Sequence, residues 1–347
     1  MYFSSIAFFL LSFQVVNAQV VQGFVYDERS LPVVGATVYF DGTTIGTTTN
    51  TEGFFTINLK AFSNSALVVS YMGYQTVIIS NPFEVITHSI TLVPKPLTIR
   101  EVFVVPNPFT REQMIKVFRQ EFLGANWAGR RCVILNEDDI DLYFDYESNR
   151  LEATSLKPLQ IENRYLGYRV EFDLVEFYVK FNKRSLKRDF IHSSLFLGTS
   201  LFADYPEVSN RQLRRRHDSY LGSQLNFFRD LAKMSWGKEG FMIFVGSLPA
   251  LPNTAFAVKD TLGLKQVTIL PDPQAPQILD VHGNPIRPKA RSFNLLYRRR
   301  QQSMVKFSTS QFYIDAHGNN SHPNQIAFGG EMGKRRFGNL LPLDYEP

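Results

Sequence analysis

Cysteine is almost absent from this chain of 347 residues, in which Cys132 stands alone. A single cysteine excludes an internal disulfide, so stability must come from burial of a core. Cys132 follows two arginines and precedes the apolar run Val133–Leu135, a pattern that predicts the start of a buried strand. The alternative is a reactive thiolate favoured by the neighbouring arginines.

Complete catalytic motifs are also missing. Zinc hydrolysis needs a His and a Glu on one turn with a second, distant His, and no H-E-x-x-H occurs among the six histidines. There is no G-x-S-x-G elbow, P-loop or dinucleotide fingerprint, and two S-x-x-K matches, at Ser235 and Ser303, lack their partner motifs. We therefore predict no catalytic residue, no cofactor, no metal site and no enzymatic activity.

Two polar stretches leave alternatives open. His317 and His322 lie close together near Asp315, which is compatible with part of a metal site, but Gly, Asn, Ser and Pro dominate the stretch and favour a polar turn. The acidic run 136–141 lacks the ligand spacing and central glycine of a calcium loop, so a solvated turn is expected there.

Long hydrophobic runs are limited to one, Ile6–Val16, which is too short to span a bilayer. It ends at Val16-Asn17-Ala18, where the residues suit signal peptidase. The pattern predicts a signal peptide over residues 1–18 and an exported protein that lies in the periplasm or at the outer membrane and cell surface. The alternative is a buried N-terminal strand or helix.

The composition is that of a folded protein, with 44% hydrophobic, 14% aromatic and 20% charged residues, and the length favours two domains. Charge is unevenly distributed along the chain. Residues 19–97 carry three basic and five acidic side chains, a net charge of −2, whereas the rest carries 34 basic and 27 acidic ones, a net charge of +7.

Residues 19–97 alternate short runs of Val, Ile, Phe, Tyr and Thr with turn residues such as Asp41-Gly42. About seven strands follow from this spacing, enough for two antiparallel sheets packed face to face. The expected strands cover residues 23–27, 33–40, 43–49, 54–59, 67–71, 75–80 and 90–93.

The order of turn and core residues in this region resembles the carboxypeptidase regulatory-like domain, a transthyretin-like β-sandwich common in cell-envelope proteins of Bacteroidetes. The matching positions are Gly23, Val25, Asp27, Pro32, Gly35, Ala36, Val38, Gly42, Thr43, Gly46, Thr47, Thr49, Gly53, Phe54, Ser70, Tyr71, Gly73 and Tyr74. The resemblance covers about a quarter of the chain and implies a seven-stranded Ig-like fold rather than a catalytic site. The peptidase module named by the family is absent, as the histidines show.

Residues 98–109 form a predicted proline-rich connector, and residues 110–347 a larger, mostly antiparallel α+β domain with at least two helices. Thr110 and Gln113 form a capping box for the first helix. A slip in the alternation at Leu174 and Val175 predicts a β-bulge. The pattern over 210–234 is helical, and strands are expected within 241–246, 265–270, 294–300 and 311–319.

This second region is similar to the C-terminal segment that accompanies the sandwich in exported proteins of the same bacteria, a likeness that implies architecture and compartment but no activity. It rests on residues 159–174, 214–231 and 329–347. The sandwich family also precedes TonB-dependent receptor barrels, but 347 residues cannot hold such a barrel, so we predict that the chain is not a transmembrane barrel.

Basic clusters are the most prominent polar feature beyond the sandwich. One interpretation is contact with a partner or with an acidic glycan or lipid surface; the alternative is pairing with local carboxylates. Nucleic acid is not an expected partner of an exported chain. The candidate contact residues are Arg211, Arg214, Arg215, Arg216, His217, Arg298, Arg299, Arg300, Lys334, Arg335 and Arg336.

Three functions remain open at this point. The first is a non-enzymatic exported cell-envelope protein whose sandwich is a scaffold or interaction module for the second domain, with another envelope protein as partner. The second is an enzyme of a type not recognised, built around His217, Asp218 and the arginines at 214–216. The third is a binder of acidic glycan or lipid through the arginine clusters.

Overall fold

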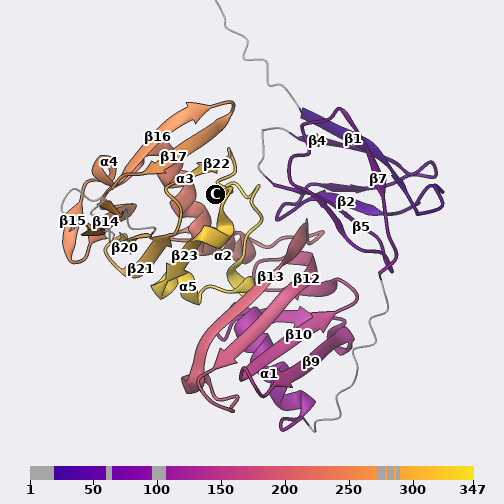
Figure 1. The fold of residues 1–347 in the computed structure, drawn as a ribbon, viewed down its shortest axis with the longest axis horizontal. Helices are drawn as coiled ribbons and strands as arrows, with labels where there is room; N and C mark the ends of the chain where they lie inside the picture. The colour runs from indigo at the N-terminus through magenta and orange to yellow at the C-terminus, as the bar shows by residue number, and fades with distance from the viewer. Residues whose placement is uncertain (1–18, 60–64, 96–106, 272–277, 280–284, 287–289) are drawn as a thin grey trace, which may run out of the picture.

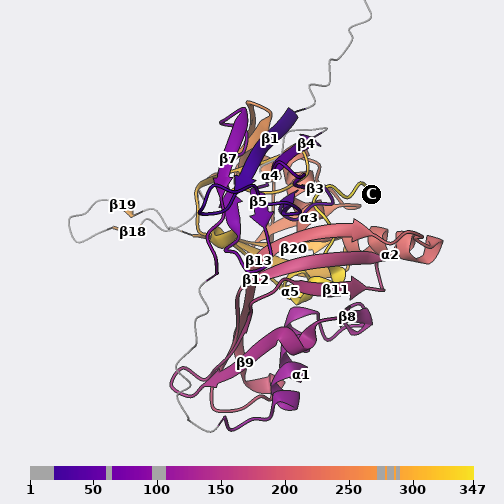
Figure 2. The same cartoon turned by 90° about the vertical axis from the view of Figure 1, so that its right-hand side faces the viewer.

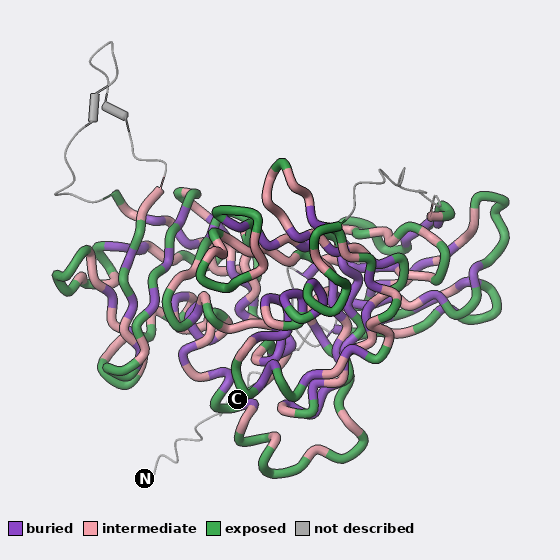
Figure 3. The backbone as a smooth tube through the Cα atoms, turned by 90° about the horizontal axis from the view of Figure 1, so that it is seen from below, coloured by how far each residue is buried: buried purple, intermediate pink, exposed green. Residues whose placement is uncertain are grey.

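The computed structural model describes residues 19–59, 65–95, 107–271, 278–279, 285–286 and 290–347. Within these, buried apolar side chains form three clusters, one in the N-terminal strands and two in the rest of the chain. Figure 1 shows the three corresponding parts in indigo, magenta and orange to yellow, and Figure 3 shows that exposure concentrates at the turns. The predicted signal peptide and most of the predicted connector lie outside the described residues.

The N-terminal part is a β-sandwich, as predicted, with two sheets in the orders β4-β1-β7 and β3-β2-β5-β6. Val25, Val38 and Leu67 lie in its core without exposed surface. The paired strands of the described residues in this part are antiparallel, except that β1 runs parallel to β7. The strands are β1 (Gln19–Tyr26), β2 (Thr37–Phe40), β3 (Gly46–Thr48), β4 (Phe54–Leu59), β5 (Leu67–Ser70), β6 (Val77–Ile79) and β7 (Thr87–Thr91).

The middle part is an antiparallel six-stranded sheet. Its order is β8-β11-β12-β10-β9, and β13 pairs with β12 over most of the length of both strands. The long β12–β13 hairpin rises from this sheet towards the sandwich (Figure 1). The strands are β8 (Cys132–Ile134), β9 (Ile140–Asp145), β10 (Arg150–Ser155), β11 (Leu159–Asn163), β12 (Tyr168–Phe181) and β13 (Ile191–Asp204).

Two local predictions for this part are confirmed. The register of β12 against β13 shifts between Leu174 and Glu176, so Val175 is the extra residue of a bulge. The side chains of Leu174 and Phe177 are both buried as a result, while Val175 is 65% exposed. Cys132 begins β8 and is buried, and burial raises the pKa of its thiol to about 12, which favours the structural interpretation over a reactive thiolate.

Helix α1 (Arg111–Phe122) packs on this sheet and carries the predicted capping box. The Gln113 N–H donates to Thr110 Oγ1 at 3.3 Å, and the Thr110 N–H donates to Gln113 Oε1 at 3.0 Å. Phe118 and Phe122 enter the core without exposed surface, because they lie one turn apart on the inner face. Figure 2 shows α1 beside β8 and β9. Three short 3₁₀ turns complete the part: η1 (Gly129–Arg131), η2 (Glu137–Asp139) and η3 (Arg188–Phe190).

The predicted helical stretch 210–234 divides into α2 (Asn210–Tyr220) and α3 (Gln224–Lys233). Gly222 has a φ of 67°, a left-handed conformation that ends a helix, and Ser223 then caps α3 by accepting from the Asn226 N–H at 3.1 Å. Apolar residues keep their helical spacing from α2 into α3, so the sequence pattern alone does not reveal the break between the two helices.

The C-terminal part contains one sheet in the order β15-β14-β20-β21-β23, a second in the order β16-β17-β22, and the pair β18-β19. Phe227 of α3 packs with Phe241 and Phe328 in edge-to-face contacts at 5.5 and 5.9 Å. The elements are β14 (Phe241–Val245), β15 (Leu248–Ala250), α4 (Pro252–Ala255), β16 (Phe256–Thr261), β17 (Leu264–Ile269), β18 (Ile278–Leu279), β19 (Pro285–Ile286), β20 (Arg291–Tyr297), β21 (Gln301–Phe307), β22 (Gln311–Ile314), η4 (Pro323–Gln325), β23 (Ile326–Gly329), α5 (Gly330–Lys334) and η5 (Phe337–Asn339).

The end of the chain returns to the middle part. Phe337 and Leu341 are buried in the same cluster as α1, and the Phe337 ring lies 5.0 Å from that of Phe122. The region after residue 110 is therefore α+β and mainly antiparallel, as predicted, and it contains two hydrophobic clusters.

Candidate functional site

The turn between β2 and β3 joins the sandwich to strand β13. The Gly42 N–H donates to the Ser200 carbonyl at 2.8 Å, and the Phe202 N–H donates to the Thr43 carbonyl at 2.9 Å. The carboxylate of Asp41 accepts from the Ser200 N–H at 2.7 Å. We call Asp41–Thr44 the docking loop. Gly42 has a φ of 75°, which allows this backbone to turn and meet β13.

The C-terminal segment binds the opposite side of the docking loop. The Leu343 N–H donates to the Gly42 carbonyl at 2.7 Å, and the Thr44 N–H donates to Asp344 Oδ1 at 3.0 Å. Arg229 of α3 donates to the Leu343 carbonyl at 2.8 Å, which connects the segment to the third part of the molecule. All three parts therefore meet at the docking loop.

Side-chain contacts flank the docking loop. The hydroxyl groups of Tyr39 and Thr199 are 2.9 Å apart. Asp173 of β12 is buried, accepts from the Thr76 hydroxyl and lies 3.9 Å from the ammonium of Lys95. Lys95 also donates to the Leu156 carbonyl at 3.1 Å. These contacts extend the interface along the β12–β13 hairpin and to the turn between β10 and β11.

Burial dominates the electrostatics of this interface. Removal from water raises the pKa of Asp41 to about 6, because the ionised carboxylate loses hydration that the N–H groups of Ser200 and Gly42 restore only in part. Burial also raises the pKa of Tyr39 well above its usual value. Asp41 therefore takes up a proton at a higher pH in this interface than a carboxyl group in water does.

Within the first basic cluster, the arginines differ in exposure. Arg216 is 6% exposed, donates to the carbonyls of Leu166 and Gly167, and pairs with Asp204 at 2.7 Å. Its guanidinium also lies 3.7 Å from the centre of the Tyr168 ring. Arg216 thus connects α2 to the middle sheet, whereas Arg211, Arg214 and His217 are exposed. Arg215 covers the Tyr165 ring at 4.5 Å.

The other two clusters lie in the C-terminal part. Arg298, Arg299 and Arg300 occupy the turn between β20 and β21, where the first two have positive φ. Arg335 donates to the carbonyls of Ser219 and Leu221, and Arg336 donates to Ser194 at 2.8 Å and pairs with Glu121 at 3.4 Å. Lys334 pairs with Glu331 at 2.7 Å.

A small cavity of about 200 Å³ lies between the end of α2 and the third basic cluster. It is lined by Asp218 and Ser219 of α2 and by Lys334 and Arg335, while His217 is not among its lining residues. The structure therefore brings the end of α2 next to α5. It does not place His217 with Asp218 in this cavity.

A larger cleft of about 800 Å³ lies between α1, η1 and β8. Lys116, Arg119, Arg130 and Arg188 contribute positive charge to its walls, and Glu137 the negative charge. Arg119 pairs with Glu137. These residues are scattered along the sequence, and only their assembly by the fold reveals a common site, so sequence analysis did not select them.

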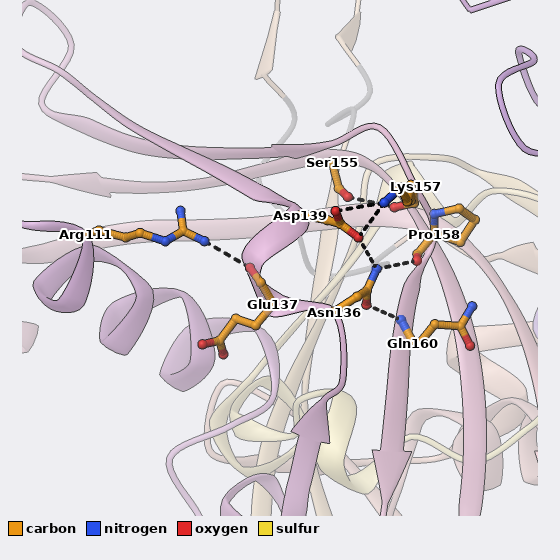
Figure 4. Close-up of polar contacts among 8 residues, drawn as sticks. All are labelled: Arg111, Asn136, Glu137, Asp139, Ser155, Lys157, Pro158 and Gln160. Atoms are coloured by element: carbon orange, nitrogen blue, oxygen red, sulfur yellow. Dashed lines mark hydrogen bonds and ion pairs between the residues drawn. The ribbon is translucent and has the colours of Figure 1, made fainter.

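Glu137, which lines this cleft, belongs to the acidic run 136–141, and this run is an ordered turn (Figure 4). Asn136 donates to the Pro158 carbonyl at 3.1 Å and accepts from the Gln160 N–H at 2.8 Å. Lys157 pairs with Asp139 at 3.0 Å, and Arg111 donates to the Glu137 carbonyl at 3.0 Å. Most polar groups of this run therefore already bond to other groups of the protein.

The histidine stretch after β22 is a polar turn. Asp315 Oδ1 accepts from the N–H groups of His317 and Asn319, both at 2.9 Å, so the carboxylate shapes the backbone. His322 Nδ1 lies 2.7 Å from the Ser321 hydroxyl. Across the described residues, no group of three or more His, Cys, Asp or Glu side chains has a geometry that suits a metal ion. None of the described helices combines the length and apolar character needed to cross a membrane.

Comparison with known proteins places the N-terminal part. Residues 21–104 match the family described as the CarboxypepD_reg-like domain. No curated protein matches the chain. One solved structure that matches is the crystal structure of a type II cohesin–X-dockerin complex, a C-terminal interface mutant, from Acetivibrio cellulolyticus. That match is 23% identical, covers 21% of this chain and 51% of the other, and has a TM-score of 0.18.

Proposed function

We propose that the protein is a non-enzymatic exported cell-envelope protein in which the CarboxypepD_reg-like sandwich is a scaffold for the α+β region. One observation carries the proposal: the docking loop makes backbone hydrogen bonds both to β13 and to the C-terminal segment. A module that only tethered its neighbour would need no such bonds. The family match of residues 21–104 agrees with a role in support or interaction.

The scaffold role is tested by cutting the chain between the two parts. A protease site inserted between residues 96 and 106 of the mature protein allows cleavage after folding, and size-exclusion chromatography then reports whether the pieces stay together. We expect them to co-elute. Separation of the wild-type pieces would contradict the scaffold role.

Two glycine variants provide a matched comparison. Both Gly42 and Gly35 have positive φ, but a Cβ at Gly42 would lie 2.9 Å from Leu343 Cδ1, whereas a Cβ at Gly35 meets nothing within 4 Å. Gly42→Val should therefore release the sandwich after cleavage, and Gly35→Val should not, although both introduce a strained backbone.

Export and partnership need separate measurements. We expect mass spectrometry to show that the purified protein begins at Gln19, and cell fractionation to find it with the envelope. A cytoplasmic protein that still carries residues 1–18 would count against export. The expected partner is another envelope protein. Repeated failure to enrich any protein or glycan from envelope extracts would count against an interaction role.

A further inference from the structure

The cleft between α1 and β8 has the features of a peptide-binding groove. Lys116 and Gln120, one turn apart on α1, form one wall, and strand β8 forms the other. The volume of about 800 Å³ lies within the range of ligand sites in proteins. Neither the sandwich nor the C-terminal sheets contribute to it.

The cleft meets β8 at its free edge. Strand β8 ends the order of its sheet and, within the part of the chain that the structure describes, pairs with β11 alone. Successive residues of a strand point to opposite faces, yet Cys132, Val133 and Ile134 all line the cleft. A cleft lined by consecutive residues runs along the side of the strand, at the edge that β11 leaves uncovered.

The register shows which backbone groups face the cleft. The Leu135 N–H donates to the Gln160 carbonyl at 2.8 Å, and the Arg164 N–H donates to the Arg131 carbonyl at 3.2 Å. Hydrogen-bonded positions alternate in an antiparallel pair, so the backbone of Ile134 points away from β11. Its N–H and carbonyl are available to a further strand, together with the carbonyl of Cys132.

Positive charge surrounds this edge. Lys116, Arg130 and Arg188 are exposed, and within the described ranges none of the three forms an ion pair. The fourth cation, Arg119, is already paired with Glu137. The floor is apolar, since Leu123 and Ile134 are buried. A ligand of this cleft therefore needs backbone groups that can hydrogen-bond to β8, small apolar side chains that contact the floor, and carboxylates that meet the cations.

We propose that this cleft binds an extended, acidic segment of a partner polypeptide, which adds to the sheet as a strand beside β8. The main-chain hydrogen bonds hold the segment in place, and its carboxylates meet Lys116, Arg130 and Arg188. The inference depends neither on export nor on the scaffold role of the sandwich. Exposed strand edges are natural sites for such pairing.

The test uses the whole mature protein and a fluorescein-labelled peptide of alternating Glu and Val, followed by fluorescence anisotropy. We expect saturable binding that weakens at least about tenfold between roughly 50 and 500 mM salt, because the attraction is between partly exposed charges. A peptide of alternating Gln and Val should bind more weakly than the acidic one. Absence of binding by the acidic peptide would overturn the proposal.

Charge reversal locates the site. Lys116→Glu combined with Arg188→Glu should reduce affinity at least about tenfold, since two attractions become repulsions. The matched control is Arg211→Glu with Arg214→Glu, the same charge change on exposed positions of α2, which should leave affinity within about twofold. Equal losses of affinity in the two double variants would mean that the peptide binds outside the cleft and would overturn the proposal. Circular dichroism before each titration verifies that the variants are folded.

Backbone methylation separates strand pairing from simple anion binding. Two further peptides carry N-methyl groups on every Val or on every Glu, so each lacks the N–H donors of one edge. At least one should lose most of its affinity. If both bind as tightly as the parent peptide, or if inorganic phosphate displaces the parent at equal concentration, the site binds anions only and the proposal fails.

Discussion

At the scale of single residues, burial at the interface changes the acidity of Asp41. Its carboxyl is buried against β13, and its pKa is about 6 instead of the usual 3.8. Asp230 shows the same direction for the same cause, with burial raising its pKa to about 6. Both acids make the folded state hold protons that the unfolded state releases.

The first prediction concerns the pH dependence of stability. Between pH 3.8 and about 6 these two acids bind more protons in the folded protein than in the unfolded chain, so their contribution to the free energy of unfolding falls as pH rises through this window. For Asp41 the shift corresponds to about 3 kcal/mol. Asp41→Asn keeps an oxygen acceptor for the Ser200 N–H but cannot ionise. Its free energy of unfolding should therefore depend less on pH than that of the wild type.

Thermal or urea unfolding at several pH values between 3.5 and 7.5 measures the effect (the range spans both pKa values). Asp230→Asn is the control, because it removes a similar acid outside the interface. Each variant should flatten the pH profile in part, and the double variant more than either. Unchanged pH dependence in Asp41→Asn would show that its carboxylate stays hydrated.

Residues also show where sequence analysis reached its limit. The run of arginines at 214–216 looks uniform in sequence, yet Arg216 is buried against Tyr168 and Asp204 while Arg214 is exposed. Consecutive side chains of a helix point in different directions, and the sequence alone does not show which of the three arginines packs against another element. The capping box at Thr110 was predictable because both of its partners lie within four residues.

At the scale of elements, the bulge in β12 is the structural cause of the slip in the sequence alternation. Val175 is an additional residue on one strand only, since Leu174 pairs with Gly198 and Glu176 with the next residue, Leu197. The phase slip in the sequence therefore predicted a real structural feature. By contrast, the break between α2 and α3 depends on Gly222 and Ser223, and an isolated Gly within a helical pattern is a weak signal.

A deletion tests this interpretation of the bulge. Without Val175, Leu174 and Phe177 become alternate residues of a regular strand, so the buried side chains stay on one face. We expect this variant to fold and to lose at most about 3 kcal/mol. Deletion of Glu171 in the same strand should instead move Val170 and Phe172 out of register and abolish cooperative unfolding. Thermal melts followed by circular dichroism distinguish the two.

At the scale of the whole molecule, the three parts meet at the docking loop. The turn Asp41-Gly42 was predictable as a turn, but its contacts with β13 and with the C-terminal segment were not. Thr44 and Asp344 are separated by 300 positions in sequence. No local pattern links such residues, and the same holds for the cleft beside β8, whose lining comes from α1, η1, β8, η2 and η3.

Removal of residues 343–347 should loosen the docking loop. Hydrogen exchange measures this directly, because the N–H groups of Gly42 and Thr44 are both bonded across the interface. We expect the amide of Thr44, bonded to Asp344, to exchange at least about tenfold faster in the shortened protein. Removal of residues 346–347 alone is the control and should leave the rate unchanged. Equal protection in both proteins would mean that the segment contributes nothing to docking.

The contact between Gly42 and Leu343 also sets an order of events during biosynthesis. A chain is synthesised from its N-terminus, so the sandwich can fold before Leu343 is made. Its docking loop gains its last hydrogen-bond partners only when Leu343 and Asp344 arrive. Chains that end before Leu343 therefore present a docking loop without these partners, and a protease that recognises exposed backbone can distinguish them.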